Sequence, residues 1–342
     1  MNETWWIDIT QLDDEQRNVL IATPDNGLLV LGPPGSGKTN ILMLRANYVR
    51  PVGTRQLFLT FTRALAEHLR SGPNIGRADQ LQRKEISTFM GWARSVIQFH
   101  GGNMPDEGGG FKEQRQKVLE ALEETIETQE LGELYDVAFV DEVQDFWARE
   151  LNALKRLANR INFAGDSRQT IWAHREGLAT AAALAHDTIE LKRHYRIGEK
   201  ICSYADQILP PKAGETSLLE GCNYKEQLRP STVETVSCSD EDEIVRRCVE
   251  KVKEQLRYIT EEPIGVVGPY NELLDKFMEV VEEDTDLAPV TVRQKSNDYQ
   301  AYDDSSRVRE RWLGLFGQIS GFAKWSLCRL VSPWCSRRVG RA

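Results

Sequence analysis

The 342-residue sequence contains no run of 18 uncharged apolar residues. A helix needs about that length to cross a bilayer, so we expect no membrane span. The N-terminal segment, which carries Trp5, Trp6 and Asp8, has no long apolar stretch and does not have the pattern of a signal peptide.

The sequence also lacks paired cysteines. Its six cysteines are widely spaced and no two form a C-x-x-C pair. Neither a zinc site nor a disulfide framework is therefore predicted, and a reducing cytoplasm is the simplest setting for the chain.

An excess of positive charge is missing as well, because the formal net charge is −9. This charge excludes a histone-like protein that binds nucleic acid by electrostatics alone, although it permits a localised groove. With 40% hydrophobic and 28% charged residues, the composition is that of a globular protein with room for two domains.

The strongest motif lies near the N-terminus. Residues 32–39 match G-x-x-x-x-G-K-[ST], after a short apolar run at 28–31 and before helical spacing in Ile41, Leu44 and Tyr48. Strand, glycine-rich loop and helix in this order predict a phosphate-binding loop, with backbone N–H groups directed at one anion. The predicted nucleotide-binding residues are Gly32, Pro33, Pro34, Gly35, Ser36, Gly37, Lys38 and Thr39.

A second motif follows a predicted strand that ends at Val140. Two adjacent carboxylates, Asp141 and Glu142, stand at the end of this strand. In a phosphate-loop enzyme an acid at this position holds Mg²⁺, and its neighbour can activate the attacking water. We therefore predict that Asp141 and Thr39 bind Mg²⁺ and that Glu142 is the catalytic base.

Further polar segments follow other predicted elements. Thr62 and Arg63 come directly after a strand at 56–60, at the edge where open α/β sheets bind ligands. A strand at 160–164 precedes Gln169 and Trp172, whose ring offers a stacking face to a base. On its own, Trp172 would more often be a core residue.

Beyond about residue 189 the motifs become sparse. Strands at 233–236 and 264–267, each followed by a helix (241–256 and 271–282), predict a second α/β unit. We expect a first lobe at 1–187, a partial second lobe at 188–309 and a Trp/Arg-rich tail at 310–342. An amphipathic helix in that tail is one alternative.

Taken in order, these segments resemble the superfamily-one DNA helicases of the UvrD/Rep/PcrA type over about residues 10–295. The segment 141–145 matches the family's D-E-x-Q-D motif, and 165–172 is similar to its G-D-x-x-Q-S-I-[YF] motif. Residues 61–63 and 88–92 resemble the family's first motifs that contact single-stranded DNA. The resemblance implies an α/β P-loop NTPase with a RecA-like parallel sheet and a second, incomplete RecA-like lobe.

The resemblance also implies roles for individual residues. It assigns Gln16 and Tyr195 to adenine, Gln169 to sensing the γ-phosphate, and Arg196 to an arginine finger from the second lobe. The expected DNA contacts are Thr62, Arg63, Trp172 and Arg175. ATP with Mg²⁺ is the implied cofactor pair, and single-stranded DNA is the implied partner, with room for a protein partner.

The sequence departs from the family at several points. Met90 stands where the family usually has His, and His194 replaces the Asn before Tyr195-Arg196. The last two helicase motifs, expected soon after Arg309, have no match, which suggests a truncated or frame-disrupted helicase.

Two classes of function follow. The first is an ATPase of the UvrD-like, 3′-to-5′ helicase type in DNA repair, replication or defence, impaired in unwinding. The alternative is a nucleotide-binding regulatory or interaction protein without motor activity.

Overall fold

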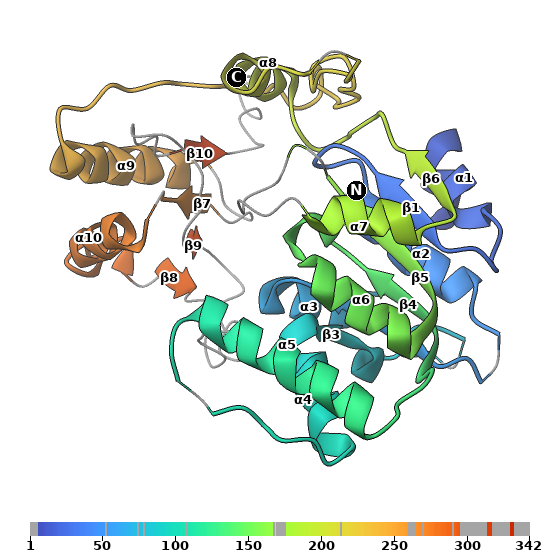
Figure 1. Cartoon of the computed structure of the whole chain (residues 1–342). Coiled ribbons are helices and arrows are strands. Elements are labelled where there is room, and N and C mark those ends of the chain that lie inside the picture. The colour runs from blue at the N-terminus through green and yellow to red at the C-terminus, as the bar shows by residue number, and fades with distance from the viewer. Residues whose placement is uncertain are drawn as a thin grey trace. The chain divides into compact units, whose positions relative to one another are not determined.

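The computed structural model divides the chain into two compact units, Met1–Arg196 and Ile197–Ala342 (Figure 1). It describes residues 6–294, apart from 52, 74, 78, 107, 167, 169–175, 213, 259–263, 269 and 289–290, and the backbone of 313–316 and 329–331. In these described parts, no helix is both long and apolar enough to cross a membrane.

The first unit is built on a six-stranded sheet in which every pairing is parallel. The strand order is β3-β2-β4-β5-β1-β6. This arrangement confirms the predicted α/β class with a parallel sheet. The strands are β1 (Leu28–Leu31), β2 (Gln56–Thr60), β3 (Ile86–Thr88), β4 (Tyr135–Val140), β5 (Ala158–Gly165) and β6 (Asp187–Glu190).

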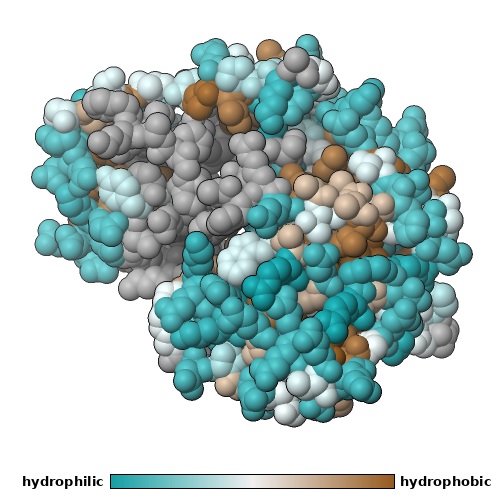
Figure 2. All heavy atoms as spheres, in the orientation of Figure 1, coloured by the Kyte–Doolittle hydropathy of each residue, from teal (hydrophilic) through white to brown (hydrophobic). Residues whose placement is uncertain are grey.

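Helices pack on both faces of this sheet (Figure 1). One face carries α1 (Asp14–Ile21), α2 (Lys38–Tyr48) and α3 (Arg63–Arg70). The other carries α4 (Phe89–Phe99), α5 (Phe111–Thr128), α6 (Ala148–Leu157) and α7 (Glu176–Leu184). Short 3₁₀ turns occur at Ile9–Gln11, Arg83–Glu85 and Val143–Asp145. Figure 2 shows mainly hydrophilic side chains over α5 and α6, as amphipathic helices require.

Alternation along the strands creates the two cores. In β1, Leu28 and Val30 belong to the core under α1–α3, whereas Leu29 belongs to the core under α4–α7. In β4, Phe139 faces the first core and Val140 the second. Both faces are covered, so β1 and the second half of β4 consist of apolar residues, and the short apolar run at 28–31 predicts a buried strand correctly.

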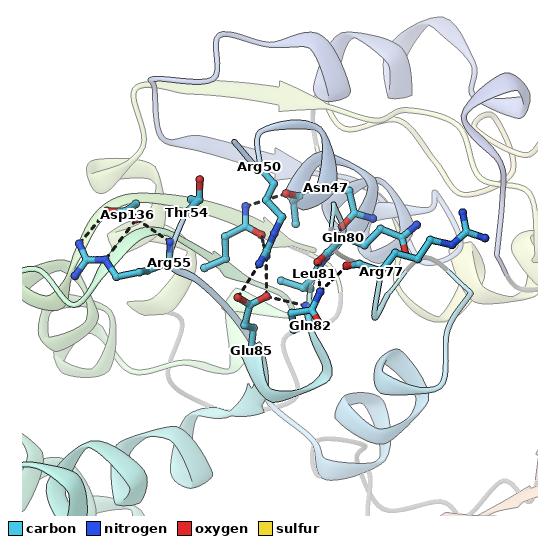
Figure 3. A network of polar contacts seen from close by, with 12 residues as sticks. Asn47, Arg50, Thr54, Arg55, Arg77, Gln80, Leu81, Gln82, Glu85 and Asp136 are labelled. Atoms are coloured by element: carbon cyan, nitrogen blue, oxygen red, sulfur yellow. Dashed lines mark hydrogen bonds and ion pairs between the residues drawn. The ribbon is translucent and has the colours of Figure 1, made fainter. Parts of the chain in front are cut away.

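A polar network joins the amino ends of β2, β3 and β4, away from the phosphate loop (Figure 3). Arg50 donates to Glu85 Oε2 at 2.7 Å and to Gln56 Oε1 at 2.9 Å. Arg55 Nη2 donates to Asp136 Oδ1 at 2.9 Å. These contacts hold the amino ends of β2, β3 and β4 in place. The loops that follow the carboxyl ends of these strands therefore start from a fixed sheet.

A buried arginine fixes α1 against α2. Arg45 is fully buried, and its Nη1 donates to the carbonyls of Val19, Leu20 and Ala22 at 2.9–3.1 Å. Its Nε donates to Asn162 Oδ1 at 2.9 Å. Burial lowers the pKa of Arg45 to about 10. The guanidinium satisfies the last carbonyls of α1, which have no partner within the helix, and so it holds α1 beside the phosphate loop.

The second unit contains α8 (Glu199–Ile208), α9 (Glu241–Leu256) and α10 (Asn271–Glu282). Its four-stranded sheet has the order β10-β7-β9-β8, formed by β7 (Ile264–Val267), β8 (Thr291–Gln294), β9 (Leu313–Phe316) and β10 (Arg329–Val331). Strand β9 runs parallel to β7 and β8, and β10 is antiparallel to β7. Helices α9 and α10 bury apolar side chains against β7.

Two cysteines of the second unit, distant in sequence, lie together. The Cys202 and Cys222 sulfurs are within 4.8 Å of each other, and both thiols donate to the Ile197 carbonyl, at 3.4 and 3.3 Å. Burial, and then the neighbouring Cys222, raises the pKa of the Cys202 thiol to about 12. Sequence spacing gave no sign of this pair.

Three sequence-based expectations need correction. Residues 233–236 form no strand. Residues 313–316, within the stretch considered for an amphipathic helix, form strand β9 instead. The expected lobe boundary after residue 187 falls inside β6, which pairs with β1 in the first sheet. The first two errors arise because a short apolar segment does not by itself show whether it forms a strand. The third arises because local sequence does not show which strands pair.

Candidate functional site

The phosphate loop connects β1 to α2 with two glycines in the left-handed region. Gly35 has φ 78° and Gly37 has φ 87°. Side-chain-bearing residues rarely adopt these values, so glycine is required for the curl of the loop. Gly37 precedes the first turn of α2, whose N–H groups have no partner within the helix. This local geometry is that of an anion-binding loop.

Lys38 is held by the loop itself. It is 7% exposed, and its Nζ donates to the carbonyls of Gly32 at 2.7 Å and Pro33 at 3.0 Å. Asp166 Oδ2 lies 3.9 Å from the same ammonium group. The phosphate loop thus holds the ammonium group of Lys38 against its own carbonyls.

Strand order brings the acidic residues to this loop. Strand β5 lies between β4 and β1, so Asp166, which follows β5, emerges between Asp141, which follows β4, and the phosphate loop. Asp141 is fully buried and Asp166 is 2% exposed. Burial raises the pKa of Asp166, and the charge of Lys38 opposes this shift.

Asp141 and Thr39 fit a magnesium site. Both carboxylate oxygens of Asp141 are buried, and neither accepts a hydrogen bond of standard geometry from a described residue. Burial, and then the charge of Glu142, raises the pKa of Asp141 to about 7, while the side chain of Thr39 and the charge of Lys38 lower it. A buried carboxylate without a partner is costly unless a cation compensates it. Carboxylate and hydroxyl oxygens suit Mg²⁺.

Glu142 adopts a backbone conformation that is uncommon for its residue type. Its φ is 53°, in the left-handed region, where the residue precedes the turn Val143–Asp145. Such strain persists only where the surroundings enforce it, and it concentrates at functional sites. Here the Gln144 Nε2 amide donates to Glu142 Oε2 at 2.5 Å.

Gln16 and Tyr195 meet at the start of α1. Gln16 is 3% exposed and its Nε2 donates to the Ser36 carbonyl at 2.9 Å. The Tyr195 hydroxyl donates to Asp13, whose other oxygen accepts the Gln16 N–H at 2.8 Å. The two residues that the resemblance assigns to adenine therefore share one hydrogen-bonded group beside the phosphate loop.

The expectation that Arg196 comes from the second lobe is not met, because Arg196 groups with the first unit. The backbone N–H of Tyr195 donates to the Gly35 carbonyl at 3.1 Å. A Cβ placed on Gly35 would lie 3.1 Å from the Arg196 Cβ. Segment 195–196 thus lies directly on the phosphate loop, a proximity that sequence spacing could not show.

Thr62 and Arg63 lie exposed where β2 ends and α3 begins. Thr62 is the N-cap of α3, and its Oγ1 accepts the Leu65 N–H at 3.2 Å. Three other predicted residues, Gln169, Trp172 and Arg175, lie outside the described residues.

Four residues of this region escaped sequence reasoning as individual contributors: Asp13, Gln144, Asp166 and Arg115. Gln144 and Asp166 stand inside recognised motifs, which was a usable signal. Arg115 lies on α5 and donates to Glu150 Oε1 at 2.5 Å and to the Asp145 carbonyl at 2.8 Å. Nothing in its helical pattern distinguishes it from its neighbours.

Comparison with known proteins agrees with this geometry. Residues 16–175 match the family model of an AAA domain. This domain is P-loop NTPase-like and is found in UvrD/Rep-type helicases. The match begins at Gln16 and includes the phosphate loop and the segments 141–145 and 165–172. No curated protein gives a significant match to the chain. The AAA match and the parallel sheet together support nucleotide binding and NTPase activity.

Proposed function

We propose that the chain is an ATPase of the UvrD-like helicase type that acts on single-stranded DNA in repair, replication or defence. The observation that carries the ATPase role is the unpartnered Asp141 carboxylate, buried at the same sheet edge as the phosphate loop. Lys38 and Asp166 occupy this edge as well, 3.9 Å apart.

In the proposed reaction, the loop N–H groups and Lys38 bind the β- and γ-phosphates. Mg²⁺, held by Thr39 and Asp141, would neutralise phosphate charge. Glu142 accepts a proton from the attacking water, whose oxygen forms a bond to the γ-phosphorus. The bond between that phosphorus and the β–γ bridging oxygen breaks, giving ADP and phosphate. Gln16 and Tyr195 contact the adenine, Gln169 senses the γ-phosphate, and Arg196 supplies positive charge.

Single-stranded DNA binding is proposed at the carboxyl edge, through Thr62, Arg63, Trp172 and Arg175. The exposure of Thr62 and Arg63 beside the start of α3 supports this placement. We propose weak binding with little sequence preference, because such contacts reach the backbone and the base faces. The unmatched last helicase motifs further suggest ATP turnover without robust duplex unwinding.

Two substitutions test the ATPase role by titration calorimetry and phosphate release. Lys38→Ala removes a charged hydrogen bond that contributes about 1.5–3 kcal/mol, so ATP affinity is expected to fall at least tenfold. Glu142→Gln is expected to keep ATP affinity and abolish turnover. Unchanged affinity in Lys38→Ala would refute the assignment.

ATPase rates with and without single-stranded DNA separate the two classes of function. Stimulation by DNA supports the motor-type ATPase. ATP binding without stimulation supports the alternative, a nucleotide-binding regulator. Strand displacement on a 3′-tailed duplex tests the expected impairment, and multiple-turnover unwinding would contradict it.

A further inference from the structure

An exposed aromatic residue stands beside the proposed DNA contacts. Phe111, the first residue of α5, is 56% exposed. Its ring lies edge-on to that of Phe61, with centroids 6.2 Å apart and an interplanar angle of 82°. Phe61 directly precedes Thr62, so α5 brings Phe111 to the carboxyl edge of β2 from about 50 residues further along the sequence.

The ring below Phe111 is firmly held. Phe61 packs edge-on against the buried Phe146, at a centroid distance of 6.1 Å. The Arg115 Cζ lies 4.9 Å from the Phe61 centroid, and the Arg115 side chain is fixed by Glu150. Because Phe111 and Arg115 are one turn apart on α5, both lie on the face that meets Phe61. The exposed ring therefore has a rigid support, which lowers the entropy cost of stacking a ligand on it.

The charges around Phe111 favour an anionic ligand. Lys112 is adjacent and exposed, and the exposed Arg63 follows Phe61 by two residues. The N-terminus of the 18-residue helix α5 adds partial positive charge at the same place, and the one acidic residue of its first turn, Glu113, pairs with Lys117. A flat apolar ring bordered by cationic side chains matches a nucleobase attached to a phosphodiester, because the ring offers a stacking face for the base and the cations attract the phosphate.

We propose that Phe111 is a stacking platform for one base of single-stranded nucleic acid bound at the carboxyl edge of the first sheet. The proposal rests on the proposed function and names a residue that positions the bound nucleic acid. Base stacking on an aromatic side chain contributes about 5- to 160-fold to affinity per base.

The test measures binding of a fluorescently labelled oligothymidylate to the full chain by anisotropy. Phe111→Ala is expected to weaken binding at least fivefold, Phe111→Leu to weaken it similarly, and Phe111→Trp to retain it. Leucine is the decisive comparison because it keeps apolar volume but has no flat π-face. ATP affinity is expected to stay unchanged in all three variants.

Phe99→Ala is the matched control. Phe99 is 85% exposed at the end of α4. Arg94 contacts Gln114 at 3.1 Å, and Gly102 lies against Thr125, so α4 and α5 run in the same direction. Phe99 therefore lies about three turns away from Phe111, and its substitution is expected to leave DNA binding unchanged.

The outcomes distinguish the two proposals. If the unmodified chain binds the oligonucleotide and Phe111→Ala binds it equally well, the stacking role is refuted while DNA binding stands. Equal weakening by Phe99→Ala, or full binding by Phe111→Leu, would also refute it. If the unmodified chain binds ATP but no oligonucleotide, the DNA-binding part of the proposed function fails, and the stacking role fails with it.

Discussion

Gln144 Oε1 accepts the backbone N–H of Asp166 at 3.1 Å. The other end of the same buried amide donates to Glu142. One side chain therefore links the loop after β5 to the proposed catalytic base after β4. The amide suits this position because its Nε2 donates in one direction while its Oε1 accepts in the other.

Gln144→Glu should lower kcat for ATP at least tenfold with little change in KM. The new carboxylate would repel Glu142 and remove its donor, so the acidic limb of the kcat–pH profile should move to higher pH. Steady-state phosphate release between pH 5.5 and 9 measures both effects. Gln116→Glu, on the exposed side of α5, is the control and should leave the profile in place. A normal kcat in Gln144→Glu would contradict a supporting role for the amide.

The free energy of unfolding should fall as pH rises towards neutrality because of Asp145. Burial, and then the charge of Glu142, raises its pKa to about 7, against the opposing charge of Arg115. Because the folded-state pKa exceeds the unfolded value of 3.8, its stabilising contribution is complete below about pH 4 and is lost as pH passes 7. The slope per group is at most about 1.4 kcal/mol per pH unit.

Calorimetric scans at pH 5.5 and 7.5 test this pH dependence. The Tm of Asp145→Asn should fall less between the two pH values than that of the unmodified chain. Asp136→Asn is the control with the opposite sign, because hydrogen bonds from Arg55 lower the pKa of Asp136. Its contribution is constant above about pH 5, so its substitution should leave the pH difference unchanged. An undiminished fall in Asp145→Asn would show that Asp145 is not the titrating group.

The Arg115–Glu150 ion pair should be sensitive to loss of one partner. The two side chains are 5% and 0% exposed, and Arg115 also lies 4.3 Å from the Trp147 ring centroid. Arg115→Met leaves Glu150 buried without its cation, which typically costs about 3–5 kcal/mol. The double variant Arg115→Met/Glu150→Met should recover part of this loss.

Urea denaturation of these variants gives the comparison. Arg149→Met serves as the control, since Arg149 pairs with Glu123 at a side-chain exposure of 54% and 27%. Exposed pairs of this kind contribute about 0–1 kcal/mol. Equal destabilisation by Arg149→Met and Arg115→Met would contradict the role of burial.

Gln16→Ala should weaken the binding of ATP more than the binding of inorganic tripolyphosphate. The expected loss for ATP is about tenfold, because the amide is proposed to contact adenine while its Nε2 is within reach of the phosphate loop. Gln11→Ala is a close match: Gln11 forms the same type of capping box with Asp8, but in an exposed 3₁₀ turn. It should leave both affinities unchanged. Equal losses of affinity for ATP and tripolyphosphate in Gln16→Ala would show that Gln16 supports the phosphate loop and does not contact adenine.

Local patterns in the sequence determined several elements of the first unit and the identity of its phosphate loop. The apolar run 28–31, the glycines and Lys38 interact within a few residues of one another, so their geometry follows from short-range sterics and hydrogen bonding. The same holds for the strand that ends at Val140, directly before Asp141. For these residues, the type and order of the amino acids were sufficient.

Only the tertiary structure decided which distant residues meet. The position of β5 between β4 and β1 places Asp166 beside Lys38, and β6 beside β1 brings segment 195–196 onto Gly35. Phe61 and Phe111 meet because α5 packs near the end of β2. Strand order and helix packing depend on burial summed over the whole core, which no local pattern contains. The sequence therefore determined the chemistry of the site, and the packing of the sheet decided which residues come together there.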